Sequence, residues 1–391
     1  MISEIYREDR ERRRLGSLTV YAGPTHSGKT KKLEAEAERA QRQGRRMQRL
    51  ATQPTAGRLL DALDPQTELV VIDDGQEYDG ALMEVTDLLA TTHRIDVVVA
   101  GWELDYTGKA QGPIPELLCS ADLAVKLDDG VCARPGCRNL ASRTQRFLAQ
   151  KGQAERFLPV CRRHHSPTAI SGEFQEGWFE EPSGSLDLVS GCMFSGKTQE
   201  LIRRLDQERF AGATIQAFKP ALDDRYAIEA VASHRAVRFP AIAVPDANAI
   251  EEQLRDETRV VGIDEAQFFG PEIVPLCGRL ADRGLHVIVA GLDLDFLNRP
   301  FGPMPQLAAQ ADRLTKLQAS CQFPGCGSHH ATRTQRLVDG HPAPADSPLV
   351  VIGGAAGYEA RCRHHHRVGL PRSREVASIA AGEELFPELE G

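Results

Sequence analysis

The chain contains one glycine-rich pattern twice, and this repeat constrains its fold more than any other feature. The first copy spans residues 23–30 and the second spans residues 191–198. Each copy follows a short run of β-forming residues and precedes a stretch in which leucine, alanine and charged residues recur at helical spacing. Strands that alternate with helices favour a mainly parallel sheet covered by helices, so we expect an α/β fold in each half of the chain.

Later landmarks recur in the same order in both halves. They are an acidic strand end (70–76 and 261–267), a valine-rich run (97–101 and 287–291) and Arg-Thr-Gln-Arg (143–146 and 333–336). The stretch between the copies is rich in acidic residues, glycine, proline and serine. We therefore predict a tandem duplication, with a first domain over residues 1–172 and a second over residues 183–391.

The repeated pattern, Gly-x4-Gly-Lys-Thr, is a Walker A phosphate-binding loop (P-loop). Its backbone N–H groups surround a polyphosphate, its lysine approaches the outer phosphates, and its threonine offers a hydroxyl to magnesium. We expect both halves to have, or to descend from, a nucleotide site. The candidate residues are Gly23, Gly28, Lys29 and Thr30 in the first half and Gly191, Cys192, Met193, Phe194, Ser195, Gly196, Lys197 and Thr198 in the second.

Two carboxylates follow the apolar run 260–263 of the second half. Asp264 stands where a second magnesium ligand beside Thr198 is expected, at the carboxyl end of a strand. Glu265 follows it directly, and a carboxylate there could accept the proton of a hydroxyl that attacks a γ-phosphate. Spacing alone leaves open that Glu265 is only a solvated charge at the end of a strand.

The second half, from about residue 187 to residue 365, resembles the type II thymidine kinases. The motifs that carry the resemblance are the loop 191–198, Phe-Lys-Pro-Ala-Leu-Asp-Asp-Arg-Tyr at 218–226, Ser-His at 233–234, Ile-Asp-Glu-Ala-Gln-Phe-Phe at 263–269, and the segments 291–296, 299–302 and 351–358. The resemblance implies transfer of the ATP γ-phosphate to the 5′-hydroxyl of thymidine, with deoxyuridine left open as a second acceptor.

The resemblance also implies roles for individual residues. Glu265 would be the general base, Arg225 would stabilise charge near the transferring group, and Lys197 would hold the donor phosphates. Further residues are expected around the nucleotide or the nucleoside: Gln267, Asp223, Leu292, Phe296, Thr334, Gly353 and Tyr358. Taken alone, aromatic residues such as Phe296 and Tyr358 would suit a hydrophobic core as well.

Cysteines recur at metal-ligand spacing in both halves. The predicted zinc ligands are Cys132, Cys137, Cys161 and His164 in the first half and Cys321, Cys326, Cys362 and His365 in the second. Thymidine kinases of this type usually have four cysteines with Cys-x2-Cys first, so this chain departs from the pattern. The departure leaves open whether His165, His364 or His366 is a ligand instead.

The charge balance limits the partners of the protein. The chain has 47 basic and 55 acidic residues and a net charge of -8, which disfavours nucleic acid as a main partner. Residues 1–14 lack the apolar run of a secretory signal, and no run of about 20 apolar residues occurs. We therefore expect a cytoplasmic protein with no membrane partner and a small nucleoside as substrate.

The first half lacks counterparts of the segments 223–226 and 351–358, and Asp74 stands where Glu265 stands in the second half. We therefore expect a catalytically silent partner domain that keeps the fold and the zinc site, with ATP binding left open; a second kinase with another acceptor is the alternative. Enzymes of the resembled family form tetramers, which implies a homo-oligomer, a dimer of tandem chains. A zinc-stabilised nucleotide-binding regulator without turnover remains the rival function, and the net charge disfavours a nucleic-acid ATPase.

Overall fold

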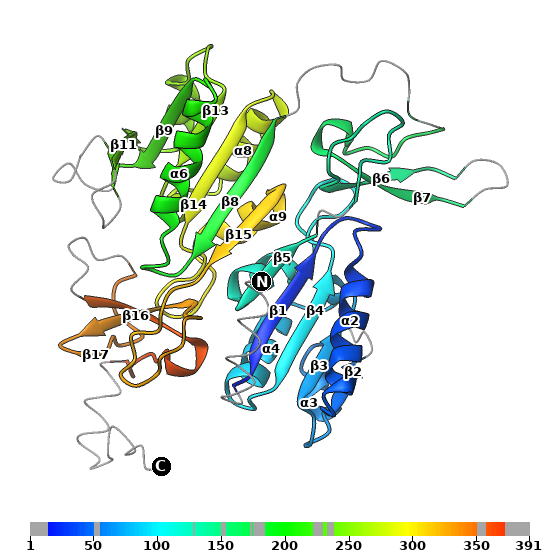
Figure 1. Cartoon of the computed structure of the whole chain (residues 1–391), viewed down its shortest axis with the longest axis vertical. Helices are drawn as coiled ribbons and strands as arrows, with labels where there is room; N and C mark the ends of the chain where they lie inside the picture. Colours follow the sequence, from blue (N-terminus) through cyan, green and yellow to red (C-terminus); the bar gives the residue numbers. More distant parts are fainter. Residues whose placement is uncertain are drawn as a thin grey trace.

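The structure is a computed structural model. It describes residues 15–50, 55–127, 130–149, 154–172, 174, 184–221, 230–232, 238–349 and 357–371. These residues form two parallel sheets with helices and three smaller antiparallel sheets, so the predicted α/β class is confirmed (Figure 1). No helix in the described ranges is long and apolar enough to cross a membrane.

The first sheet has five parallel strands in the order β2-β3-β4-β1-β5. Their bounds are Ser17–Ala22 (β1), Met47–Leu50 (β2), Leu69–Ile72 (β3), Asp96–Gly101 (β4) and Leu123–Lys126 (β5). The helices are Lys29–Arg42 (α2), Arg58–Asp61 (α3), Leu82–Thr91 (α4) and Ile114–Ser120 (α5). The central strands consist largely of valine, leucine and isoleucine because helices bury both of their faces.

The second sheet has six parallel strands in the order β12-β9-β13-β14-β8-β15. Their bounds are Ser185–Gly191 (β8), Ile215–Pro220 (β9), Ile242–Val244 (β12), Val260–Ile263 (β13), His286–Gly291 (β14) and Arg313–Leu317 (β15). The helices are Lys197–Phe210 (α6), Ala247–Glu252 (α7), Ile273–Asp282 (α8) and Met304–Gln310 (α9). Without the edge strand β12, its strand order repeats that of the first sheet, and each phosphate loop joins the equivalent strand and helix.

An antiparallel ribbon follows each sheet. In the first half Arg143–Phe147 (β6) pairs with Arg156–Val160 (β7), and in the second Arg333–Val338 (β16) pairs with His341–Pro342 (β17) and Tyr358–Arg361 (β18). A short 3-10 turn ends each ribbon, Arg162–His164 (η2) and Arg363–His365 (η6). Two short strands, Ala230–Ala232 (β10) and Arg238–Pro240 (β11), form a further antiparallel pair. The 3-10 turns Gly75–Glu77 (η1) and Ala266–Phe268 (η4) follow β3 and β13.

The two halves meet through equivalent elements. Strands β5 and β15 lie side by side, and helices α5 and α9 pack together (Figure 1). One buried apolar cluster continues across this contact and includes Leu117, Leu118 and Leu307. The interface is therefore part of the hydrophobic core rather than a loose contact between two bodies.

Buried charges cross the same interface in a nearly symmetric arrangement. The Lys126 ammonium donates to the carbonyls of Ala309 (2.7 Å) and Ala311 (2.5 Å) at the end of α9, and it pairs with Glu103 at 3.2 Å. In return, the Lys316 ammonium donates to carbonyls at the end of α5. Each lysine thereby supplies positive charge to the carbonyl end of a helix in the other half, where the helix dipole favours it.

Candidate functional site

The phosphate loop of the second half is held in shape by its own backbone and side chains. Gly191 has φ +148, and a Cβ there would lie 2.5 Å from the Leu317 carbonyl oxygen, so only glycine fits. The Lys197 ammonium and the Ser195 hydroxyl both donate to the Cys192 carbonyl, each at 2.8 Å. Lys197 is buried at the start of α6, whose first N–H groups have no hydrogen-bond partner within the helix and can face an anion.

An oxygen pair lies beside this loop. The Thr198 hydroxyl donates to Asp264 Oδ2 at 3.0 Å, and the Glu265 backbone N–H donates to Asp264 Oδ1 at 3.0 Å. Burial and the neighbouring Glu265 charge raise the pKa of Asp264 to about 7. Hydroxyl and carboxylate oxygens are magnesium ligands, and a divalent cation there would offset the cost of the buried charge, so this pair fits magnesium.

Glu265 leaves the end of β13 in a left-handed backbone conformation, with φ +53. Gln267 Nε2 donates to Glu265 Oε2 at 2.5 Å, and Gln267 Oε1 accepts the Leu292 backbone N–H at 2.9 Å. The buried Gln267 thereby ties the Glu265 carboxylate to the loop after β14. Glu265 itself stays partly exposed, so its carboxylate is accessible to a ligand.

Three residues predicted to bind the nucleoside, Phe296, Thr334 and Tyr358, lie on or beside β16. The Arg336 guanidinium lies 5.2 Å from the Phe296 ring centre and 6.0 Å from that of Tyr358, so the two rings share one cation. The Thr334 hydroxyl accepts the Met193 backbone N–H at 3.0 Å and joins this ribbon to the phosphate loop. Arg336 was not among the predicted site residues, although its place in the repeated Arg-Thr-Gln-Arg segment was a signal.

Several predicted residues lie outside the described residues. They are Asp223, Arg225 and Gly353, together with the motif residues Asp224, Tyr226, Ser233, His234, Val351 and Gly354.

The first half has equivalent contacts around its glycine-rich loop, with some of the side chains changed. The Lys29 ammonium donates to the carbonyls of Gly23 (2.8 Å) and Pro24 (2.7 Å), and burial lowers the pKa of Lys29 to about 8. The Thr30 hydroxyl donates to Asp73 Oδ2 at 3.2 Å, as Thr198 does to Asp264. The aspartate in the place of Glu265, Asp74, is exposed, and it accepts from Gln76 Nε2 at 3.1 Å.

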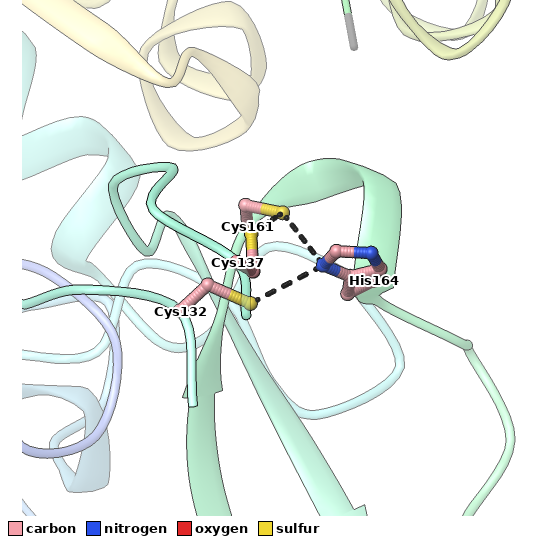
Figure 2. Close-up of side chains that lie close together, drawn as sticks. All are labelled: Cys132, Cys137, Cys161 and His164. Atoms are coloured by element: carbon pink, nitrogen blue, oxygen red, sulfur yellow. Dashed lines mark hydrogen bonds between the residues drawn. The ribbon is translucent and has the colours of Figure 1, made fainter. Parts of the chain in front are cut away.

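Three cysteines and one histidine converge in each half, and they are the residues predicted from the sequence. Figure 2 shows the first cluster, Cys132, Cys137, Cys161 and His164, and the second comprises Cys321, Cys326, Cys362 and His365. In each cluster all ligand atoms lie within 4.8 Å of one another.

The spacing of these atoms fits zinc. Cys137 and Cys161 Sγ are 4.0 Å apart, and His164 Nδ1 is 3.4 Å from Cys132 Sγ and 3.3 Å from Cys161 Sγ. With Zn–S near 2.3 Å and Zn–N near 2.0 Å, a tetrahedral ion requires about 3.8 Å between sulfurs and about 3.5 Å from sulfur to nitrogen. Two sets of three thiols and an imidazole can therefore each hold one zinc ion.

The neighbouring histidines have other partners. His165 Nε2 lies 2.9 Å from the Tyr106 carbonyl oxygen, His364 Nε2 lies 2.9 Å from that of Gly16, and His366 Nε2 lies 3.0 Å from that of Phe296. These contacts direct the three rings away from the sulfurs, which favours His164 and His365 as the imidazole ligands.

Both halves have an α/β sheet in which a Gly-x4-Gly-Lys-Thr loop joins a strand to a helix, the arrangement typical of nucleotide-binding proteins. The family model for thymidine kinase matches residues 52–165 and 184–366, which make up more than half of the chain. The chain therefore belongs to the thymidine kinase family. The first matched segment begins after the phosphate loop of the first half.

Curated relatives agree with this assignment. A thymidine kinase from Deinococcus radiodurans is 50% identical over 194 residues, which cover 47% of this chain and 90% of the relative. One from Coprothermobacter proteolyticus is 50% identical over 194 residues (50% of this chain, 92% of the relative), and one from Deinococcus deserti is 50% identical over 195 residues (47% and 95%). These relatives are each about half as long as this chain.

Proposed function

We propose that the second half of the chain transfers the γ-phosphoryl group of ATP to the 5′-hydroxyl of thymidine. One observation carries the proposal: the Glu265 carboxylate, clamped by Gln267, follows directly on the Asp264 that bonds Thr198 of the phosphate loop. Phosphoryl transfer depends on positioning and on neutralising charge, so it needs these groups side by side. Family membership and the names of the relatives support thymidine as the acceptor.

Each group has a separate task in this proposal. Lys197 and the loop amides bind the donor phosphates, and Thr198 and Asp264 hold magnesium, which neutralises phosphate charge when bound. Glu265 accepts the proton of the 5′-hydroxyl as that oxygen attacks. Arg225 stabilises charge on the transferring group.

The remaining site residues bind the nucleoside. Phe296 and Tyr358, with Leu292, line the base, since flat rings are bound well by aromatic and apolar side chains. Thr334 and Gly353 close the loop over the base, and Asp223 supports the site of Arg225. Gln267 acts through Glu265 as a positioning residue.

The first half serves as a partner domain without turnover. Asp74 is one methylene shorter than Glu265, so its carboxylate retreats by about 1.5 Å, and general-base catalysis needs hydrogen-bond reach. Domains over residues 1–172 and 183–391 are supported by the shared strand order, the two matched segments and the half-length relatives. Each zinc ion clamps one ribbon, and two such chains assemble as a dimer.

An acceptor screen tests the proposal. Purified protein with ATP and magnesium is incubated with thymidine, deoxyuridine, deoxycytidine or no acceptor, and ADP and nucleoside monophosphate are both measured. We expect ADP and thymidine monophosphate to form in equal amounts with thymidine. ADP formed equally without a nucleoside would indicate an ATPase, and no ADP in any arm would favour a regulator.

A further inference from the structure

The first half has an aromatic cluster that the proposed function does not use. Trp102 and Tyr106 follow β4, and Phe157 lies in β7. The ring centres of Trp102 and Phe157 are 6.3 Å apart, and those of Tyr106 and Phe157 are 6.4 Å apart. All three side chains are partly exposed, so the cluster, which we call the Trp102 cluster, is not sealed in the core.

The Trp102 cluster occupies the place that the proposed nucleoside pocket has in the second half. Phe157 pairs with Arg146 across the β6–β7 ribbon, as Tyr358 pairs with Arg336 across β16–β18. Trp102 donates its backbone N–H to Gln76 Oε1 at 3.0 Å, as Leu292 does to Gln267. The first half therefore carries an indole where the second half has Leu292, and Phe157 where it has Tyr358.

Two cations flank these rings. The Lys29 ammonium of the phosphate loop lies 5.9 Å from the centre of the Trp102 indole. The Arg146 guanidinium lies 4.9 Å from the Tyr106 ring centre, and Arg146 also donates to the Tyr106 hydroxyl at 3.1 Å. If a ligand binds Lys29 through a phosphate, the atoms attached to that phosphate would lie against the Trp102 indole. A flat heterocycle farther along the ligand would contact the aromatic rings.

A second contact joins the cluster to the phosphate loop. The Thr144 hydroxyl, on β6, accepts the Thr25 backbone N–H at 2.9 Å. The ribbon that carries Phe157 is thereby fixed against the loop that carries Lys29, and the Thr30–Asp73 pair beside it keeps the oxygen set for magnesium.

We propose that the first half binds a magnesium nucleoside triphosphate, with its base against the exposed faces of the Trp102 cluster and its phosphates at Lys29. The rings are too close together to admit another ring between them, since stacking on both faces needs about 7 Å, so the base lies on their outer side. We further infer that the first half does not hydrolyse or transfer the phosphates of this ligand. This statement rests on the proposed function, in which the exposed Asp74 replaces Glu265 and the first half has no catalytic activity.

Tryptophan fluorescence tests this site directly. The chain has two tryptophans, and Trp178→Phe leaves Trp102 as the only tryptophan. This variant is titrated with thymidine triphosphate, ATP and inorganic tripolyphosphate in the presence of magnesium. We expect saturable quenching by a nucleoside triphosphate and at least tenfold weaker binding of tripolyphosphate, which has phosphates but no base.

Two matched pairs of variants locate the signal. Lys29→Ala should weaken the quenching at least tenfold, and Lys197→Ala, the same change in the second half, should leave it unchanged. Phe157→Leu should weaken it, and Tyr358→Leu should not, with circular dichroism and melting temperature checking that each variant folds. No saturable quenching by either nucleotide, or equal losses from Lys29→Ala and Lys197→Ala, would overturn the site.

The same samples separate this inference from the proposed function. Thymidine phosphorylation measured on Lys197→Ala reports on the second half, whereas Trp102 quenching reports on the first. If Lys197→Ala keeps the Trp102 quenching and loses thymidine phosphorylation, the result supports both the binding site in the first half and the proposed function of the second half. Phosphorylation that survives in Lys197→Ala contradicts the proposed function and leaves the binding result to be judged by Lys29→Ala.

Discussion

Replacing Asp122 by asparagine should destabilise the contact between the two halves. The Asp122 carboxylate accepts the Leu18 backbone N–H (2.9 Å), the Thr332 hydroxyl (2.9 Å) and Arg363 Nε (2.8 Å), and Arg333 Nη1 lies 3.9 Å away. Thr332, Arg333 and Arg363 belong to the second half. Burial alone would raise the pKa of Asp122, but Arg363 and Arg333 outweigh it and hold that pKa well below its ordinary value.

The magnitude follows from burial. The side chains of Asp122, Arg333 and Arg363 are 5%, 1% and 3% exposed. Removing the carboxylate charge therefore takes a counter-charge from two guanidinium groups that water hardly reaches. Breaking a buried pair by removing one partner costs about 3–5 kcal/mol. Asp87 still contacts both arginines, so we expect the low end, about 3 kcal/mol, or a fall in melting temperature of roughly 6–12 °C for a unit of about 200 residues.

Thermal and urea unfolding of Asp122→Asn measure this effect. Glu251→Gln is the control because Glu251 forms ion pairs with Arg279 and Arg283 through side chains that are 38–58% exposed, and such surface pairs contribute at most about 1 kcal/mol. If Asp122→Asn lowers the melting temperature no more than Glu251→Gln does, the interface does not depend on this charge network.

Three further predictions concern the pH response, the metal clusters and the general base. Arg143 and Arg162 overcome the effect of burial and lower the pKa of Asp312 to about 2, so its stabilising contribution is present above its unfolded value of about 3.9 and is lost as pH falls through 2. Wild type should therefore exceed Asp312→Asn in stability at pH 5–7, and the difference should vanish in acid unfolding near pH 2; a constant difference would contradict the assignment. Metal analysis should find two zinc ions per chain in the wild type and one in Cys362→Ser. The control Cys277→Ser should keep two, because Cys277 is buried in α8 and belongs to neither cluster. Glu265→Asp should lower kcat about 100-fold or more with little change in the KM for ATP, and unchanged kcat would remove Glu265 as the base.

Local patterns in the sequence predicted much of the site. Glycine spacing predicted a strand, a loop and a helix in each half, which the structure has, and cysteine spacing predicted Cys161 and His164 as neighbouring ligands, which a short turn brings together. Such features depend on neighbouring residues, so a single sequence carries them. The same holds for Asp264, which follows its strand directly.

Contacts between distant segments could not be predicted in the same way. Phe157 lies opposite Arg146 because β6 and β7 pair in one particular register, and its contact with Trp102 joins segments more than 50 residues apart in the chain, so no local pattern indicates it. Lys126 at a strand end is typical of a solvated charge, yet it is buried against carbonyls more than 180 residues away. The signal was the repeat itself, because Lys316 stands at the same place in the second half.

The central claim is that phosphoryl transfer to thymidine belongs to the second half alone. The most direct measurement compares thymidine phosphorylation by Lys29→Ala and Lys197→Ala, two identical changes at equivalent places in the two phosphate loops. We predict that Lys197→Ala loses at least 100-fold in kcat while Lys29→Ala stays within about threefold of wild type. Equal losses in the two variants, or a larger loss in Lys29→Ala, would contradict the account.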